Sequence, residues 1–382
     1  MEIGYKAPDG VREVIDSLGR TEDVRFSPGN RRLAVAAFNR SRIAIFDIEV
    51  GAASVALTGV VEISSQCLNY PHGLDFLDDQ TLAVASRKGD VAVFKLPSGA
   101  GAFELAPVEI LRAGEASRLD APGSLAVTRR SDAPCELLIC NNAGHSVTRH
   151  RVDCGSGCRI ADGEVLLKRW LNLPDGICVS GDGQWIAVSN HNTHDVLIYR
   201  NSPSLDERAD PDGVLRCVYF PHGLRFSADG RHVFVADAGA PYIHIYASDG
   251  EGWAGARNPV RSIRIMDEAL FLRGRHNPQE GGPKGIDIDR GMKVLVATSE
   301  YQPLAFFDLP AMLADLPAGA PVLDVRYELG ILEQAERLRM RTAQAESRAA
   351  KAEARLLAKK RRKAWRIAAP LRRACSALWR PN

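Results

Sequence analysis

A short phrase recurs along the chain, and this repeat constrains the fold more than any other feature of the sequence. It is clearest as PHGL at 71–74 and 221–224, and it recurs with drift as PGSL at 122–125, PDGI at 174–177 and PKGI at 283–286. A sixth copy begins at residue 21 with TEDV, and successive copies start about 50 residues apart. An internal period of this size is typical of repeat folds, in which each unit buries a face of its neighbour.

Each copy is followed by the same order of apolar and turn-forming segments. A short apolar run leads into a turn such as SPGN, SGDG or SADG, then a second run such as LAVA, a polar loop and a third run such as VAVF. A fourth alternating run follows in most copies. Four antiparallel strands repeated around an axis form β-propeller blades, because stacked blades bury each other's faces. The sequence therefore predicts an all-β fold, a six-bladed β-propeller over residues 21–328, with residues 1–20 as a candidate closing strand.

The copy PHGLRFSADGRHVFVADAGAPYIHIY at 221–246 resembles the blades of NHL-repeat, YVTN-type and gluconolactonase- or regucalcin-type propellers. This likeness extends over roughly residues 20–328. Propellers of these types include enzymes, binding modules and scaffolds, so the resemblance implies the fold rather than one activity.

Two sets of equivalent positions are predicted to surround one mouth of the central channel. The start of the first strand and the end of the second lie on the same face, because the two strands are antiparallel. The first set is Glu22, His72, Gly123, Asp175, His222 and Lys284, and the second is Ala37, Ser86, Asn141, Asn190, Asp237 and Thr298. The side chains predicted to contact a ligand here are His72, Asn141, Asn190, His191, His222, Asp237 and Lys284.

Three of these positions, Glu22, Asp175 and His222, are candidate metal ligands. Gluconolactonase-type enzymes hold a divalent ion at this mouth with a Glu, an Asn and the Asp of a PDG motif; Glu22 and the Asp175 of LPDGI resemble two of these positions. Carboxylate and imidazole suit zinc, manganese or iron. The alternative is that these groups only hydrate a water-filled channel. Lys284 on the same ring repels a cation, although it suits a phosphate or a sugar acid. No catalytic residue is predicted, because the nucleophile and P-loop motifs are absent from the sequence.

The C-terminal segment differs from the repeats in charge and composition. Residues 351–382 contain eleven Lys or Arg and one acidic residue, whereas the other residues include 38 basic and 46 acidic ones. Residues 329–363 are rich in helix formers, with small residues on a heptad seam. The sequence predicts a helix there, either a lone surface helix or a weak coiled coil that joins copies of the chain.

Residues 364–382 are predicted to form a basic amphipathic segment that contacts anionic lipid of the inner membrane. The residues predicted to contact the membrane are Trp365, Arg366, Leu371, Arg372, Arg373, Leu378 and Trp379. Nucleic acid is the less favoured anion, because few base-reading groups are nearby. The stretch AWRIAAPLRRA at 364–374 resembles the WRxxxPLR ending, after a coiled coil, of bacterial glycosyltransferases and methyltransferases that assemble surface polysaccharides. This resemblance implies that the protein works in surface-polysaccharide assembly at the inner membrane, but it does not imply a reaction.

The remaining expectations concern location and function. The chain has no apolar run of about 18 residues and no basic start followed by an apolar core, so we expect a cytoplasmic protein, peripheral to the inner membrane. The first hypothesis is a non-catalytic binding or scaffold protein that works beside polysaccharide-assembly enzymes and recognises a glycan, a sugar nucleotide or a partner protein. The alternative is a metal-dependent hydrolase or lactonase with a divalent metal ion as cofactor. A nucleic-acid adaptor is the third hypothesis.

Overall fold

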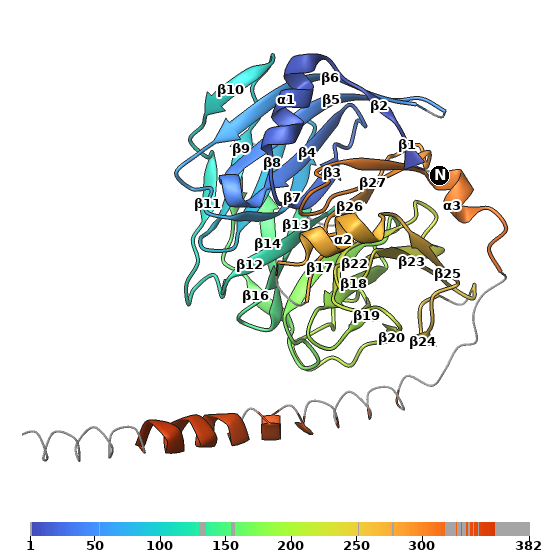
Figure 1. The fold of residues 1–382 in the computed structure, drawn as a ribbon. Coiled ribbons are helices and arrows are strands. Elements are labelled where there is room, and N and C mark those ends of the chain that lie inside the picture. Colours follow the sequence, from blue (N-terminus) through green and yellow to red (C-terminus); the bar gives the residue numbers. More distant parts are fainter. Residues whose placement is uncertain are drawn as a thin grey trace, which may run out of the picture. The chain divides into compact units, whose positions relative to one another are not determined.

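The computed structural model describes residues 2–317, except 53, 130–134, 154–156, 251 and 277–278, together with part of the segment 326–355. Residues 1–325 form one compact unit and residues 326–382 a second. In the first unit, six β-sheets are arranged around a central axis (Figure 1). The predicted all-β, six-bladed propeller is therefore confirmed.

The first three blades follow the chain from the centre of the ring outwards. Blade 1 contains β3 (Thr21–Phe26), β4 (Arg32–Ala37), β5 (Arg42–Val50) and β6 (Val55–Ser64), and β2 (Tyr5–Lys6) and β10 (Gly101–Glu104) pair with β6 in parallel. Blade 2 contains β7 (Pro71–Asp78), β8 (Thr81–Ser86), β9 (Val91–Lys95) and β11 (Glu109–Leu111). Blade 3 contains β12 (Pro122–Thr128), β13 (Cys135–Asn141) and β14 (Ser146–Asp153), and both β15 (Arg159–Ile160) and β16 (Glu164–Leu167) pair with β14.

The other three blades are built in the same way. Blade 4 contains β17 (Pro174–Val179), β18 (Trp185–Asn190), β19 (Asp195–Arg200), β20 (Gly213–Leu215) and β24 (Gly255–Arg257). Blade 5 contains β21 (Pro221–Phe226), β22 (His232–Asp237), β23 (Tyr242–Ala247) and β25 (Arg261–Arg264). Blade 6 contains β26 (Ile286–Ile288), β27 (Val294–Ala297), β28 (Ala305–Asp308) and β1 (Glu2–Ile3). The helical elements are α1 (Asp9–Ser17), the short 3-10 helix η1 (Phe38–Arg40), α2 (Glu268–Gly274) and α3 (Leu309–Leu313).

The ring is closed by the N-terminal residues. The strand β1 pairs antiparallel with β28, so the start of the chain supplies the outer strand of the last blade. The following residues form α1, whose apolar side chains Val11 and Ile15 are buried in the same cluster as Phe46 and Phe306. Closure therefore uses one strand from each end of the propeller, and β1 covers the edge that β28 would otherwise leave unpaired.

The recurring glycine of the motif is explained by contact between neighbouring blades. A Cβ atom on Gly176 would lie 2.1 Å from the carbonyl oxygen of His222, and one on Gly223 would lie 2.5 Å from that of Lys284. A side chain at these positions would collide with the inner strand of the next blade. The motif therefore contains glycine because the inner strands approach each other closely around the axis.

A break in strand register at the start of the inner strands sets the direction of their side chains. The pairing shifts between Pro71 and Gly73 and between Pro174 and Ile177, and similar shifts occur in blades 1, 3 and 5. Such bulges re-aim side chains relative to the normal alternation. As a result, the middle residue of the motif and the residue three positions later both reach the central channel.

The second unit contains the C-terminal segment. The described positions within 340–355 are helical. No helix in the described part of the chain is both long enough and apolar enough to cross a membrane. The predicted membrane-contact residues Trp365, Arg366, Leu371, Arg372, Arg373, Leu378 and Trp379 lie outside the described residues.

Candidate functional site

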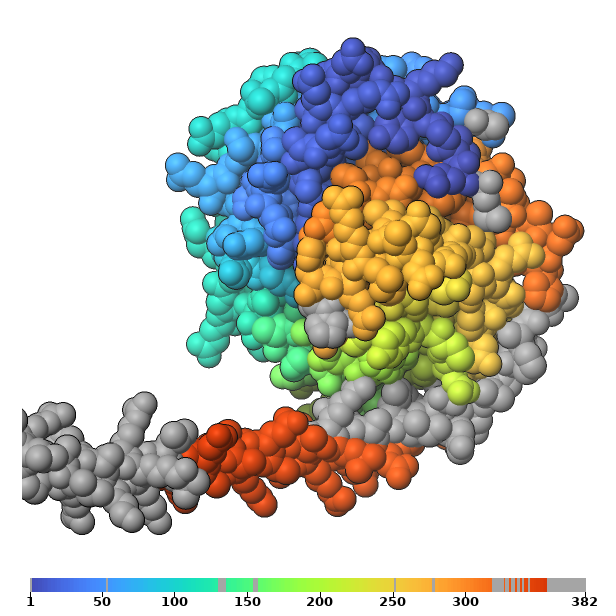
Figure 2. Space-filling view, viewed as in Figure 1, coloured from blue at the N-terminus to red at the C-terminus, as the bar shows by residue number. Residues whose placement is uncertain are grey.

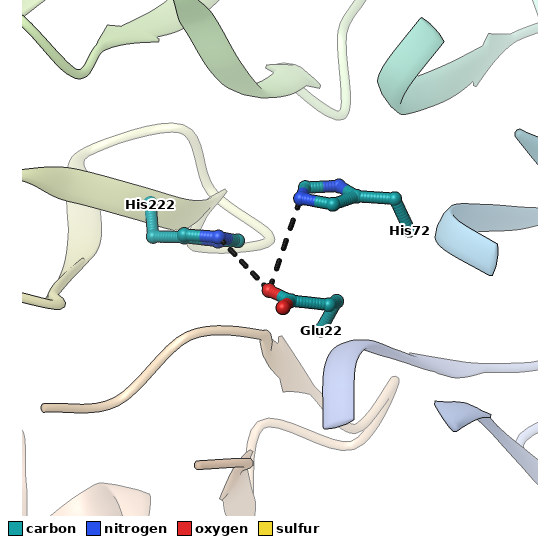
Figure 3. Close-up of side chains that lie close together, drawn as sticks. All are labelled: Glu22, His72 and His222. Atoms are coloured by element: carbon teal, nitrogen blue, oxygen red, sulfur yellow. Dashed lines mark ion pairs between the residues drawn. The ribbon is translucent and has the colours of Figure 1, made fainter. Parts of the chain in front are cut away.

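Four titratable side chains from four blades meet at one mouth of the channel. His222 Nε2 lies 3.2 Å from Glu22 Oε2 and 3.2 Å from Asp175 Oδ2. His72 Nε2 lies 3.8 Å from Glu22 Oε2 and 3.5 Å from Asp175 Oδ1. The rings of His72 and His222 are stacked with centroids 5.3 Å apart. Figure 3 shows both imidazoles directed at the Glu22 carboxylate. We call these four residues the channel cluster.

The spacing of the channel cluster suits a bound cation. The donor atoms of Glu22, His72 and His222 all lie within 4.8 Å of one another, and the three residues are buried. Bonds of about 2.1 Å in a tetrahedral zinc site place neighbouring ligand atoms about 3.4 Å apart, which is close to the separations observed here. In addition, Glu22 Oε2 is buried, and its nearest side-chain nitrogens are His222 Nε2 at 3.2 Å and Lys284 Nζ at 3.7 Å. The residues present therefore fit a divalent ion of the kind bound by imidazole and carboxylate.

Three fixed positive charges lie around the same cluster. Arg87 Nη2 donates to His72 Nε2 at 2.6 Å and lies 3.2 Å from Asp175 Oδ1. Lys284 Nζ lies 3.7 Å from Glu22 Oε2, and Arg20 forms an ion pair with the same carboxylate. Because an arginine only donates, His72 Nε2 carries the acceptor lone pair in this arrangement. A metal ion at His72 therefore has to displace Arg87.

Asn142 contacts the channel cluster from blade 3, where the motif position is a glycine and offers no side chain. Gly123 occupies the ring position of blade 3, and a Cβ atom there would lie 2.1 Å from Asn142 Oδ1. The glycine thus leaves room for Asn142, whose Nδ2 donates to Asp175 Oδ1 at 2.9 Å. The Oδ1 atom of Asn142 is buried and accepts no hydrogen bond in the described structure. It is a further oxygen that a ligand or cation can use.

The loop before blade 6 adds Glu280 to this face. Glu280 forms an ion pair with Lys284, and its Oε1 lies 3.6 Å from His191 Nε2. His191 Nδ1 in turn lies 3.7 Å from Asp175 Oδ2. In the view of Figure 1, α2 from the same loop lies across the middle of the ring, and Figure 2 shows gold atoms covering this area. The loop therefore covers the mouth at which the channel cluster lies.

The protonation states of the site follow from burial and from the neighbouring charges. Burial lowers the pKa of His72 to about 3, and Arg87 adds to this shift. Burial also lowers the pKa of His191. For Asp175, burial raises the pKa, but His222, His72 and Arg87 outweigh it and hold the pKa well below its usual range. The carboxylate is therefore ionised at neutral pH and the imidazoles of His72 and His191 are neutral, which is the state in which these groups bind metals.

Burial by itself also raises the pKa of Glu22, but Lys284 and Arg20 hold it well below the usual value. For Glu280, burial is likewise outweighed by Lys284, and the pKa falls to about 2. Both groups are therefore anionic donors at neutral pH.

The structure brings some of the predicted ligand-contact residues into the site and not others. His72, His191, His222 and Lys284 lie in or beside the channel cluster, with the predicted metal ligands Glu22 and Asp175. The predicted ligand-contact residues Asn141, Asn190 and Asp237 do not. They accept backbone N–H groups from Asp120, Asn172 and Tyr219, respectively, at 3.0, 2.6 and 2.8 Å. These three side chains hold the loops that lead into the inner strands.

Sequence reasoning missed three charged or polar members of the site, Arg20, Arg87 and Asn142. Arg20 directly precedes the first repeat, and Arg87 and Asn142 directly follow the second strands of blades 2 and 3. For Arg87 and Asn142, the signal that could have found them is the residue directly after each aligned position at the end of the second strand. Arg20 lies two residues before the aligned Glu22.

Comparison with known proteins gives a fold and no activity. No protein-family model matches the chain, and no curated protein matches its sequence. The structure is similar to that of a functionally unknown protein from Desulfotomaculum acetoxidans DSM 771, with a TM-score of 0.52 and 12% sequence identity. The similarity covers 80% of this chain and 89% of that chain. At this identity the similarity concerns the propeller fold alone.

Proposed function

We propose that the channel mouth binds one divalent metal ion and that the protein is a metal-dependent hydrolase of small esters or lactones. The observation that carries the proposal is the convergence of His72, His222 and the two carboxylates of Glu22 and Asp175 from four separate blades. The buried Oδ1 atom of Asn142, which accepts no hydrogen bond in the described structure, adds to it. The resemblance of Glu22 and Asp175 to the gluconolactonase pattern is a second, weaker support.

Each group would have a defined role in such a site. Glu22, Asp175, His72 and His222 would hold the ion, which polarises a bound carbonyl and lowers the pKa of a bound water. Asn142 Oδ1 and His191 Nδ1 are buried and without hydrogen-bond partners in the described structure, so both can contact a ligand. Lys284 and Arg20 keep Glu22 ionised and attract the anionic part of a substrate.

A non-catalytic binding module is the second candidate, and a specific observation favours it. Arg20, Arg87 and Lys284 lie within ion-pair distance of the buried carboxylates. These charges offset the carboxylates without any metal ion, and a cationic rim suits a glycan acid or a sugar nucleotide. In that case the mouth recognises a ligand and performs no reaction.

Metal titration followed by an activity assay separates the two candidates. Protein stripped of metal is titrated calorimetrically with zinc and manganese, and Asp175→Asn is compared with Asp47→Asn, which changes an exposed carboxylate. We expect about one equivalent to bind at micromolar concentration, with loss of affinity only in Asp175→Asn. Hydrolysis of a panel of aliphatic esters and lactones by the metal-loaded protein supports the enzyme. Binding without hydrolysis supports the module, and no binding removes the metal proposal.

For the C-terminal segment we propose contact with anionic lipid at the inner membrane, near enzymes that assemble surface polysaccharides. The support is the excess of basic residues in 351–382 and the resemblance of 364–374 to the ending of such enzymes. Flotation with vesicles of phosphatidylglycerol and phosphatidylethanolamine tests the lipid contact. The full chain should float and a chain ending at residue 350 should not; equal flotation of both contradicts the proposal.

A further inference from the structure

The channel has a second polar mouth at the far ends of the inner strands. Each inner strand begins at the channel cluster and runs away from it along the axis, so its last residues lie at the opposite end. A cavity of about 410 Å³ opens there. Its wall contains the residue three positions after the middle residue of each motif: Arg25, Asp75, Ala126, Cys178, Arg225 and Asp287. The cavity is therefore a second ring of equivalent positions, separate from the first.

This second mouth carries more positive than negative charge. Arg129 and Arg290 also line the cavity, so four arginines face the two aspartates Asp75 and Asp287. A third carboxylate, Asp23, lies next to the ring and reduces the excess from two positive charges to one. A concave surface with this balance attracts small anions.

The carboxylates of the ring are already used by the protein backbone. Asp75 Oδ2 accepts the N–H of Val127 at 2.8 Å, and Asp287 Oδ2 accepts the N–H of Phe26 at 2.7 Å. Both bonds join the inner strand of one blade to that of the next. The second oxygen of Asp287, Oδ1, accepts from Arg225 Nε at 2.9 Å, so Arg225 is already paired within the ring.

Arg25 has donor capacity that the described structure does not satisfy. Its side chain is 5% exposed, and its Nη1 atom is buried without a hydrogen-bond acceptor. The nearest ion-pair partners are distant, with Asp23 Oδ1 3.8 Å from Nη1 and Asp75 Oδ1 3.6 Å from Nε. Arg25 Nη2 donates to the carbonyl oxygen of Leu125 at 3.3 Å, so the unsatisfied donor is Nη1 alone. A buried N–H group without an acceptor is costly, and an anion in the cavity would supply an acceptor for Nη1.

Arg129 and Arg290 keep their charge available at the rim. Arg290 Nη2 donates to the carbonyl oxygen of Phe26 at 2.9 Å, and Arg129 donates to the carbonyl oxygens of Phe76 and Leu77. Neither arginine lies within ion-pair distance of a carboxylate in the part of the chain that the structure describes. The backbone bonds fix the two side chains in place and leave their charges available to an anion.

We propose that the second mouth binds the phosphate group of a small metabolite. Guanidinium groups from different blades surround one cavity, and a phosphate offers acceptor oxygens in several directions, whereas a carboxylate offers two in one plane. The opposite side of the cavity is lined by the small residues Ala126, Cys178 and Gly181, which leave space for the rest of the molecule. This site is independent of the metal proposed at the first mouth.

Titration of the full-length protein with inorganic phosphate tests this proposal. Binding is followed calorimetrically at low chloride, and acetate is the second probe. We expect phosphate to bind at or below about 1 mM, and acetate to bind at least about tenfold more weakly. Arg25→Gln and Arg290→Gln should each weaken phosphate binding by about tenfold or more. Arg290 is exposed, so Arg290→Gln decides the question if Arg25→Gln does not fold.

Two control variants show whether phosphate binds at this mouth or elsewhere on the protein. Arg112→Gln removes an exposed arginine on blade 2 and should leave phosphate binding unchanged. Asp175→Asn disturbs the first mouth and should also leave it unchanged. Absence of phosphate binding to the unmodified protein, equal binding by Arg290→Gln, or equal affinity for acetate overturns the proposal.

Discussion

His222 Nε2 lies 3.2 Å from Glu22 Oε2, although one residue is in blade 5 and the other in blade 1. The two side chains meet because the motif places one residue of every blade at the same height on the channel wall. The same relationship joins His72 in blade 2 to Asp175 in blade 4. A site assembled in this way depends on the positions of all the blades around the axis. Substitutions within the blades should therefore lower stability, whereas substitutions of the channel cluster should lower metal affinity.

Removal of Arg87 should strengthen metal binding. Its guanidinium occupies the lone pair of His72 Nε2, which a metal ion needs. We expect Arg87→Gln to bind zinc or manganese more tightly, by about tenfold, and Arg31→Gln, which changes an exposed arginine, to bind as the unmodified protein does. Isothermal titration measures both. Weaker binding by Arg87→Gln would mean that Arg87 supports the site rather than competes for it.

The motif glycine should be far less tolerant of substitution than a glycine on the surface. A Cβ atom on Gly176 would lie 2.1 Å from a backbone oxygen of blade 5. We therefore expect Gly176→Ala to lower the free energy of unfolding by roughly 1–3 kcal/mol or more. Gly10 in α1 has open space around it, and Gly10→Ala should be neutral or stabilising. Urea unfolding compares the two, and equal effects would contradict the close approach of the inner strands.

Asn190 should matter for stability and not for ligand binding. Its amide accepts from Asn172 N and donates to the carbonyl oxygen of Trp170. Because both bonds are buried, their loss should lower the free energy of unfolding by roughly 1–3 kcal/mol. Asn190→Ala is therefore expected to unfold at lower urea concentration with unchanged metal affinity, and the exposed Asn39→Ala should change neither. Loss of metal affinity in a folded Asn190→Ala protein would place this residue in the site after all.

Acid should destabilise the propeller partly through His150 in β14. Burial lowers the pKa of this imidazole, whose nitrogens contact Thr148 Oγ1 and the carbonyl oxygen of Ala161. The unfolded chain takes up a proton near pH 6.5, whereas the folded protein resists it. Stability is therefore fully present above that pH and declines below it. His150→Gln should show a smaller difference in unfolding free energy between about pH 7.5 and pH 5; an unchanged difference would exclude this role.

The fold was predictable because the sequence repeats one motif about every 50 residues, with one copy for each blade. Equivalent positions of a repeat must lie at equivalent places in a ring, so Glu22, His72, Asp175 and His222 could be assigned to one mouth without coordinates. What repeat alignment cannot supply is the direction of neighbouring side chains. Asn141 and Asn142 are adjacent, yet the first holds a backbone N–H and the second reaches Asp175.

The charged residues next to the aligned positions were harder to predict for a related physical reason. Arg87 follows the end of a second strand, and its reach into the channel depends on the turn that it occupies. The left-handed conformation before the motif prolines of blades 2 to 5, with φ of 58° at Tyr70 and 62° at Phe220, is likewise not evident from residue type. These turns are held by Ser86 and Asp237, which accept from the backbone of the loops. Loop geometry of this kind decides which polar groups reach the ligand.

Metal binding at the channel cluster is tested most sharply by a crystal structure of the protein grown with zinc or manganese, with diffraction data collected on both sides of the metal absorption edge. We expect a single anomalous peak bounded by Glu22, His72, Asp175 and His222, with Arg87 moved away from His72. A map without a peak at this position, in crystals from a solution that contains the metal in excess, would contradict it.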